Sequence, residues 1–423
     1  MEDTYIQPAD PRDSSGPEES SDGEASIKST RSCSSYNMLE PVHENGRRYC
    51  DSTYFMPNDE TELTRLNILH QIYLILLDGH LTTAPFRSNP QSSPRILDIG
   101  TGPGDWAIEM SAEFPNAEII ASDIGVFDSG LGQLELPNVD FQLADAQSEW
   151  TYHEPFDLVH MRGLSGAFAD WGRIYQQAFA HLKPGGFIEV ADADPAGDTI
   201  CFCPESGNGD EVEVEGMRDL DLDSDEDDDD SDSEPEPEQE SKSESQPTPA
   251  PTQTNLQKYT TALRTAAREA GYPRDLEHLR TTALTAAGFV DIRVIERSIP
   301  IGLWPSDIGE KTLGKMTLIA LLEGLEAYAL RPLTASGKWS LDEARALCEL
   351  VKEEVLSAEG LRVKVRVVTG RKPVPFAQKR KDVLARARAR ARFFREKGIV
   401  PGDGEGEGEG DDWDGEKDHH DPS

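Results

Sequence analysis

The residues best suited to chemistry in this sequence are three closely spaced glycines and the acid that precedes them. In the segment 95–110, "RILDIGTGPGDWAIEM", Asp98 stands two residues before Gly100, and Gly102 and Gly104 follow at spacings of two. A glycine-rich turn between a strand and a helix lets backbone N–H groups and the helix N-terminus approach a ligand closely. The segment therefore predicts a ligand-binding turn.

The spacing of the glycines restricts which ligand this turn can bind. A turn that binds a nicotinamide dinucleotide reads G-x-G-x-x-G, which requires a glycine at position 105 when counted from Gly100. The residue there is Asp105, and the pattern is instead D-x-G-x-G-x-G. The spacing disfavours a nicotinamide-dependent oxidoreductase.

The elements that position this turn are apolar runs of strand length that alternate with helical patterns. Runs of this kind, each buried on both faces, are typical of a parallel sheet between helices. The expected strands are 95–100, 117–124, 139–146, 156–163 and 187–192, and the expected helices are 104–114 and 171–182, the latter ended by "KPGG". Beyond an acidic stretch we expect helices at 254–270, 274–287, 308–330 and 340–358 and strands at 289–297 and 361–370.

The glycine segment resembles the first motif of class I methyltransferases that use S-adenosylmethionine. The longer segments "YFMPNDETELTRLNILHQ", "WTYHEPFDLVHMRG", "DWGRIYQQAFAHLKPGGFIEVAD" and "LLEGLEAY" are similar to the fungal methyltransferases of the LaeA type. Members of that family regulate secondary metabolism or modify products of biosynthetic pathways. The resemblance covers about 50–200 and 254–372 and implies a Rossmann-like, doubly wound α/β fold with a seven-stranded, mostly parallel sheet.

The resemblance also implies roles for residues at successive strand ends. Asp98 would hold the ammonium group of the cofactor, Asp123 would accept both ribose hydroxyls through its two carboxylate oxygens, and Asp145 would bind the adenine amino group. The implied cofactor-binding set is Asp98, Gly100, Thr101, Gly102, Gly104, Asp123, Ile124, Asp145, Ala146 and His160.

Two departures from the family pattern border the implied site. Pro103 and Asp105 stand where the family usually has threonine and an apolar residue, and "IGVFDSGLGQLELP" replaces a Ser-Pro-Ile-Gln-Pro run after Asp123. Proline is tolerated at a first helical position, and an acid there suits the helix dipole. Asp105 would nevertheless repel the carboxylate of the cofactor.

Methyl transfer requires positioning and a dry site, and a general base only when the acceptor must lose a proton. The candidate catalytic residues are His160 and Arg162 at the open end of the fourth strand, with Tyr54 or Asn58 from the N-terminal segment. His160 would act as the base, or would pack and hydrogen-bond to a loop. Arg162 would bind an acidic group of the substrate, or would pair with a structural carboxylate.

Charge divides the chain into segments. Residues 1–24 carry 8 acids and 1 base, residues 205–245 carry 20 acids and 2 bases, and residues 401–423 carry 10 acids and 1 base. Such segments cannot bury enough apolar surface to offset their chain entropy. We therefore predict a disordered N-terminal tail (1–45), a methyltransferase domain (50–204 and 252–372), an acidic disordered insert (205–251), a basic helical extension (373–400) and an acidic disordered tail (401–423).

The remaining features point to an intracellular protein of the nucleus or cytoplasm. Five cysteines form no disulfide framework and no zinc site, no signal peptide opens the chain, and the apolar run 63–81 contains charged residues that exclude a membrane span. We expect no metal, no membrane and no nucleic-acid substrate. The expected partners are a small-molecule or protein acceptor and regulatory proteins. The alternative is a regulatory scaffold that keeps the fold and has little or no turnover.

Overall fold

The computed structural model describes residues 41–86, 93–125, 127, 136–193, 200–202, 212–214, 253–375, 388 and 392. The strands are β1 (Val42–Glu44), β2 (Arg47–Tyr49), β3 (Arg95–Ile99), β4 (Glu118–Asp123), β5 (Val139–Leu143), β6 (Phe156–Arg162), β7 (Leu182–Asp192), β8 (Ile200–Phe202), β9 (Val212–Val214), β10 (Val290–Pro300) and β11 (Leu361–Arg371). The helices are α1 (Glu60–Leu76), α2 (Asp105–Glu113), α3 (Trp171–His181), α4 (Asn255–Glu269), the 3-10 helix η2 (Glu277–Leu279), α5 (Thr281–Ala286), α6 (Ile308–Ala335) and α7 (Leu341–Ser357).

The main sheet has the strand order β5-β4-β3-β6-β7-β11-β10-β9, and β8 pairs with β11. Strands β5, β4, β3, β6 and β7 are parallel, whereas β11 runs antiparallel to both β7 and β10. The chain reverses its direction of travel across the sheet between β3 and β6, and ligands bind at such a switch point in open α/β sheets. Seven long strands confirm the predicted doubly wound sheet, and the short strands β8 and β9 extend it.

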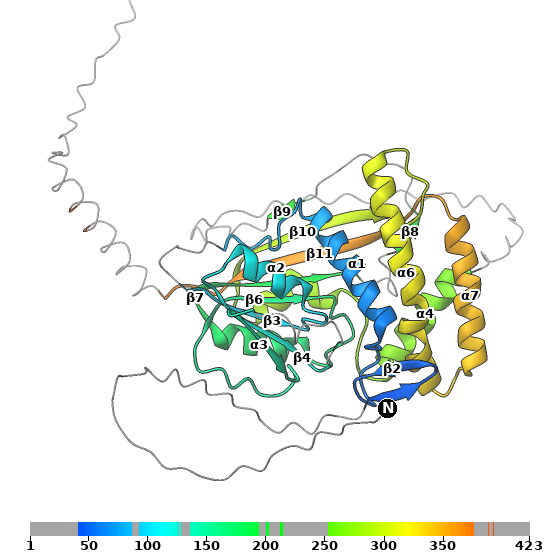
Figure 1. Ribbon diagram of the computed structural model, residues 1–423, viewed down its shortest axis with the longest axis horizontal. Coiled ribbons are helices and arrows are strands. Elements are labelled where there is room, and N and C mark those ends of the chain that lie inside the picture. Colours follow the sequence, from blue (N-terminus) through cyan, green and yellow to red (C-terminus); the bar gives the residue numbers. More distant parts are fainter. Residues whose placement is uncertain are drawn as a thin grey trace, which may run out of the picture. The chain divides into compact units, whose positions relative to one another are not determined.

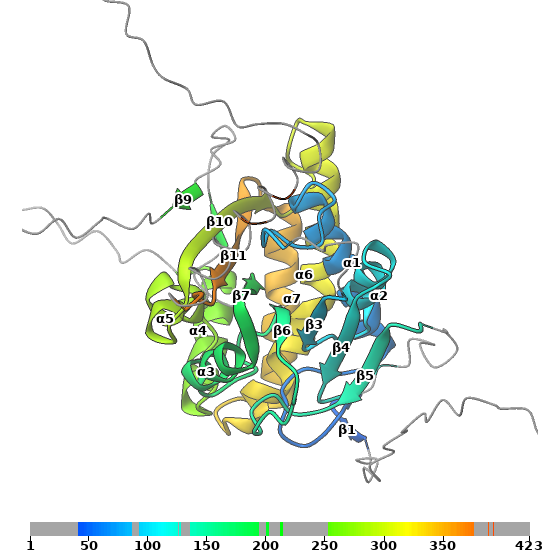
Figure 2. The ribbon, with the colours of Figure 1, turned by 90° about the vertical axis from the view of Figure 1, so that its left-hand side faces the viewer.

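Helices cover both faces of the sheet (Figures 1 and 2). On one face, Trp106 and Met110 of α2 pack on Ile96 and Leu158. The same face carries α1, α4, α6 and α7, whose apolar side chains form one cluster with residues of β7, β10 and β11 such as Ala191, Ile299 and Val367. On the other face, α3, η2 and α5 bury the opposite side chains of the same strands, including Leu97, Val159, Ile188 and Val368. The near-continuous apolar character of the central strands follows from burial on both sides.

The structure differs from the sequence-based prediction at 274–287, where one helix was expected. The segment is instead η2 followed by α5, and Arg280 between them has an extended backbone. The carbonyl of His278 accepts a hydrogen bond from the Tyr175 hydroxyl at 2.7 Å, which anchors the segment to α3. Similarly, β7 begins at Leu182 and takes in "KPGG", because the Gly185 N–H donates to the carbonyl of Lys372 at 2.9 Å.

Two segments predicted to be disordered contain strands. Within 1–45, β1 pairs with β2 through a turn at Asn45 and Gly46, which both have positive φ as a two-residue hairpin turn requires. Within the predicted insert 205–251, β9 adds to the edge of β10. The rest of the insert, the acidic tail 401–423, and the basic extension 373–400 apart from 373–375, Arg388 and Arg392 lie outside the described residues.

Candidate functional site

The glycine turn leads from β3 into α2 at the carboxyl edge of the parallel strands. Gly100, Gly102 and Gly104 have φ values of 69°, 56° and 90°, which other residues rarely adopt. A Cβ on Gly100 would overlap the Leu164 side chain, whereas one on Gly102 would meet only Leu66 of α1, at 3.6 Å. The turn is therefore packed tightly against Leu164 at Gly100, whereas at Gly102 there is room for another group between the turn and α1.

Asp123 at the end of β4 is joined directly to this turn. Its Oδ2 accepts the Gly102 N–H at 2.8 Å, and its Oδ1 accepts the N–H of Gly125 at 2.9 Å. Burial raises the pKa of Asp123, and these N–H groups oppose the rise. A carboxylate has about four lone-pair sites, so two backbone bonds leave acceptor capacity for a ligand.

The next strand end carries Asp145, Ala146 and the packing that fixes them. Asp145 is exposed, and its Oδ1 accepts the N–H of Gln147 at 2.8 Å. The carbonyl of Ala146 accepts the indole N–H of Trp150 at 2.9 Å. Trp150 is 8% exposed and belongs to the core, so it anchors this loop and does not line a pocket. Ile124 follows Asp123 and is partly exposed.

Asp98 and His160 lie beneath the turn as a buried pair. Their strands place them side by side in the register of β3 and β6, and Asp98 Oδ1 lies 2.7 Å from His160 Nδ1. Each residue is 2% exposed, and the Trp106 ring stacks on the imidazole with centroids 3.8 Å apart. Asp98 Oδ2 is buried without a hydrogen-bond partner among the described residues, as is Thr101 Oγ1 in the turn itself.

Arg162 lies two residues beyond His160 on the same face of β6. Its Nη2 donates to Nδ1 of His70 at 2.9 Å, and its guanidinium lies over the Tyr73 ring at 4.9 Å from the centroid. Both partners come from α1. Burial lowers the pKa of Arg162, and burial together with the positive charge of Arg162 lowers the pKa of His70. The predicted candidates His160 and Arg162 are therefore neighbours, but only Arg162 reaches the surface of the site.

The N-terminal segment lies against the loop that follows Asp123. A Cβ built on Gly125 would be 3.0 Å from Cβ of Cys50 and 3.5 Å from Nδ2 of Asn58. Arg331 of α6 fastens this segment by donating to the carbonyls of Asp51 and Tyr54 at 2.8 and 2.7 Å. Asn58 thus lies beside the loop that follows Asp123, and Arg331 fixes Tyr54 in the same segment.

Sequence reasoning missed His70, Trp106 and Arg331 as parts of the site. His70 offered a signal, because it is a polar residue inside an otherwise apolar helix. The sequence-based prediction also missed a second buried pair at the end of β7. There, Asp192 Oδ2 lies 3.4 Å from His278 Nε2, and the Trp171 ring stacks on the imidazole with centroids 4.1 Å apart.

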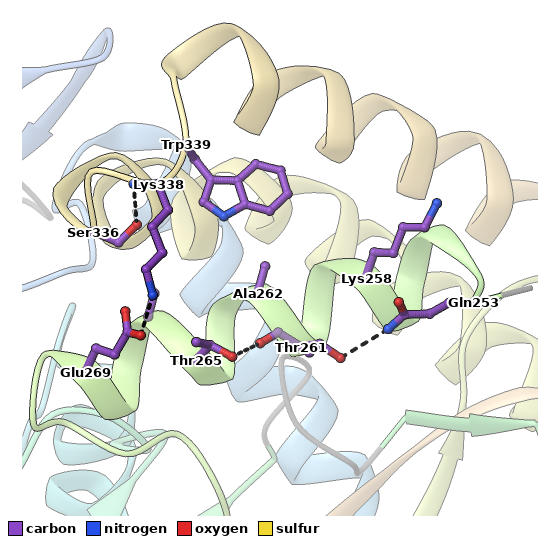
Figure 3. A pocket seen from close by; sticks show the side chains of 10 residues that line it. Gln253, Lys258, Thr261, Ala262, Thr265, Glu269, Ser336, Lys338 and Trp339 are labelled. Atoms are coloured by element: carbon purple, nitrogen blue, oxygen red, sulfur yellow. Dashed lines mark hydrogen bonds and ion pairs between the residues drawn. The ribbon is translucent and has the colours of Figure 1, made fainter.

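A pocket of about 310 Å³ lies elsewhere, between α4 and the turn that joins α6 to α7 (Figure 3). Figure 3 shows Trp339 facing Ala262 of α4, with Lys338 reaching Glu269 beside them. None of the predicted site residues lines it. Within the described ranges, no group of three or more His, Cys, Asp or Glu residues could hold a metal ion, and no helix is long and apolar enough to cross a membrane.

Comparison with known proteins places this geometry in a family. A profile described as a methyltransferase domain matches residues 68–273. The chain is 32% identical over 321 residues to the secondary metabolism regulator LAE1 of Cochliobolus heterostrophus, covering 74% of this chain and 88% of that protein. It is 26% identical over 337 residues to the methyltransferase pytC of Aspergillus terreus, covering 78% of this chain and 88% of that protein.

A third relative is the secondary metabolism regulator laeA of Monascus pilosus, 27% identical over 327 residues, which covers 75% of this chain and 74% of that protein. These matches, the strand order of the sheet and the glycine turn at its switch point agree with one another. The chain belongs to the LaeA-type family of methyltransferases.

Proposed function

We propose that the protein transfers a methyl group from S-adenosylmethionine to a small-molecule or protein acceptor, with the cofactor across the carboxyl ends of β5, β4, β3 and β6. Membership of a methyltransferase family makes S-adenosylmethionine the cofactor, as predicted. The observation that carries the placement is the junction of Asp123 with the glycine turn, because it brings a carboxylate and bare backbone to one edge of the sheet.

The residues present fit this cofactor. Three positive-φ glycines reduce the number of side chains in the turn, Gly102 has room for a neighbour, and Thr101 Oγ1 has no hydrogen-bond partner in the part of the chain that the structure describes. Asp123 retains acceptor capacity for ribose hydroxyls, and Asp145 stands at the next strand end for the adenine amino group. The cofactor supplies an electrophilic methyl group when bound.

The protein's own contribution is to position and to exclude water. Helix α1 covers the turn through Leu66 and contacts β6 through His70, so it closes the site from the solvent side. Buried His160 is held by Asp98 and Trp106, so we assign it a positioning role beneath the turn. An acceptor would approach over the ends of β6 and β7, the side of the sheet away from Asp123 and Asp145.

The test is calorimetric titration of the full chain with S-adenosylhomocysteine, the product form of the cofactor. We expect saturable binding by the wild-type protein and binding weakened at least tenfold by Asp123→Ala. Absence of binding at millimolar ligand would favour the regulatory scaffold over the enzyme.

Two cellular roles are open to this protein, regulation and biosynthesis, because the relatives include proteins named regulators and proteins named methyltransferases. We propose a role in secondary metabolism. Metabolite profiling of a strain that lacks the protein separates the cases. Loss of one product and accumulation of its unmethylated precursor indicate biosynthesis, whereas changes in many unrelated products indicate regulation.

A further inference from the structure

Five polar side chains meet where α1, α2 and β6 come together, next to the glycine turn. They are Asn67, His70, Asp105, Glu109 and Arg162. Apart from Arg162, none of them was expected to take part in binding. The inference drawn from them rests on the proposed function, since it concerns which groups of S-adenosylmethionine these side chains recognise.

Arg162 carries a positive charge that no ion pair in the described part of the chain offsets. Its contacts are His70 Nδ1 and the Tyr73 ring, and no described carboxylate lies within 4.0 Å of its guanidinium nitrogens. A guanidinium has five N–H donors, and one contact to an imidazole leaves most of them available. Because a poorly solvated cation is costly without a counter-charge, the position favours an anionic ligand group.

His70 holds Arg162 in a fixed orientation. An arginine only donates, so Nδ1 of His70 must accept, and the imidazole proton then resides on Nε2. That nitrogen lies 3.2 Å from Oε1 of Glu109. His70, with its lowered pKa, is therefore neutral, and it lies between the carboxylate on α2 and the guanidinium on β6.

Asp105 supplies a negative charge to the same cluster. It is the first residue of α2, and burial raises the pKa of its carboxyl while the positive charge of Arg162 opposes that rise. With the Asn67 amide oriented so that its nitrogen faces Asp105, that nitrogen donates to Oδ2 at 2.7 Å. Asp98, in contrast, is committed to His160 and is 2% exposed.

The strand order indicates which part of the cofactor reaches this cluster. Asp145 and Asp123 mark the adenosine end at β5 and β4, and neighbouring strands lie about 4.8 Å apart. The opposite end of the molecule, an α-amino acid, therefore extends past β3 toward β6 and the start of α2. We propose that Arg162 binds the carboxylate of this amino acid and that Asp105 binds its ammonium group, with Glu109 and His70 orienting the arginine.

This assignment gives a reason for the acid at position 105. An acid beside the cofactor carboxylate would repel it, but the amino-acid end carries both charges. Arg162 offers a cation and Asp105 a carboxylate to this zwitterion, so each charge of the amino acid meets a charge of opposite sign.

The experiment is a titration with three ligands: S-adenosylhomocysteine, its decarboxylated analogue and its deaminated analogue. Arg162→Gln should weaken S-adenosylhomocysteine by about 10- to 100-fold, the range expected for one charge-assisted hydrogen-bond partner, and should weaken the decarboxylated analogue less than about twofold. Asp105→Asn should weaken S-adenosylhomocysteine and leave the deaminated analogue unchanged. Arg173→Gln, which removes an exposed arginine from α3, is the matched control and should change nothing.

Arg162→Lys keeps the charge and should recover part of the affinity, and thermal melts of each variant establish that it is folded. If Arg162→Gln weakens both S-adenosylhomocysteine and the decarboxylated analogue equally, or weakens neither, the assignment is wrong. Loss of methyl transfer with unchanged ligand binding would also overturn it and would place Arg162 at the acceptor. Failure of the wild-type protein to bind any of the three ligands would instead refute the proposed function, and this inference with it.

Discussion

Asp98 and His160 form a buried pair directly under the glycine turn, with Oδ1 and Nδ1 2.7 Å apart and the Trp106 indole stacked on the imidazole. The register of β6 with β7 continues this row of polar residues to Glu189, whose carboxylate accepts the N–H groups of Thr83 and Ala84. This row of polar residues connects β3, β6 and β7 with the segment 81–84, next to the candidate site.

Asp98→Asn should therefore destabilise the fold as well as the turn. Loss of a charged, buried hydrogen-bond partner lowers the free energy of unfolding by about 1–3 kcal/mol. Urea denaturation of the variant measures this, and Asp140→Asn on the exposed surface of β5 is the control. Unchanged midpoints for Asp98→Asn would show that the pair contributes nothing. His160→Gln should destabilise the fold in the same way, because the ring is 2% exposed and belongs to the same buried pair.

Gly102 and Gly79 form a matched pair that separates strain from binding. Both have positive φ, 56° and 82°, and neither would bring a new Cβ into a clash. Alanine at each position should lower stability by a similar amount, roughly 1–2 kcal/mol for a residue forced into the left-handed region. Only Gly102→Ala should weaken S-adenosylhomocysteine, and Gly102→Val should abolish its binding. Equal affinities for Gly102→Ala and Gly79→Ala would contradict close approach of the cofactor.

Asp123→Ala and Asp145→Ala should differ in the size of their effects on cofactor binding. Asp123 joins the turn through Gly102 and offers acceptors to two hydroxyls, each bond to a charged acceptor being worth about 1.5–3 kcal/mol. Asp145 is exposed and offers one contact, so its loss should weaken binding several-fold less. Titration of both variants with S-adenosylhomocysteine measures the difference. A larger effect at Asp145 would place the ribose elsewhere.

His70 should make stability depend on pH just below neutrality. Burial and Arg162 lower the pKa of His70 from its usual 6.5, so near that pH the unfolded chain binds a proton that the native state excludes. The free energy of unfolding should fall as the pH drops below about 6.5 and be constant above it. His70→Asn should reduce the slope just below about pH 6.5. Asp105 has a raised pKa and therefore acts in the opposite direction: its contribution to the free energy of unfolding decreases as the pH rises above the usual aspartate pKa of 3.8. If the pH dependence of the free energy of unfolding is the same in His70→Asn as in the wild type, the pKa of His70 is not lowered in the folded state.

Deletion of 206–250 should leave affinity for S-adenosylhomocysteine unchanged, because long insertions in a connection after β7 add little closure entropy. Since β9 pairs with β10, this deletion should lower the melting temperature slightly. Deletion of 216–250, which keeps β9, should not. A large fall in melting temperature for the shorter deletion would mean that 216–250 packs on the domain.

The sequence was informative wherever function follows from position along a strand. Asp123 and Asp145 could be placed because parallel strands end at one edge, and the glycine turn could be placed because a strand and a helix flank it. The sequence could not show that the Asp98 carboxylate contacts the His160 imidazole, because that contact depends on the register between β3 and β6. The partner of Arg162 could not be found either, since His70 lies 92 residues earlier on another element.

The hairpin of β1 and β2 shows the same limit. Its first strand, β1, belongs to the tail 1–45 predicted to be disordered, and contacts with α6 hold the hairpin: Glu44 accepts from Arg331 at 2.9 Å, and the guanidinium lies 3.5 Å from the centroid of the Tyr49 ring. Composition measures the average of a segment, whereas one buried arginine fixes a local structure within it.

The place of β11 between β7 and β10 has a consequence for synthesis on the ribosome. This strand is the last long one to be made, yet it occupies the interior of the sheet and pairs with both neighbours. While residues 193–360 are translated, the edge of β7 that later pairs with β11 has no partner. During the same interval β10 cannot join the sheet, because it pairs with the other strands through β11. Chaperone protection is most needed during that interval, since unpaired strand edges promote association between chains. A chain truncated before Leu361 would keep the glycine turn and lose the strand that joins the two ends of the sheet.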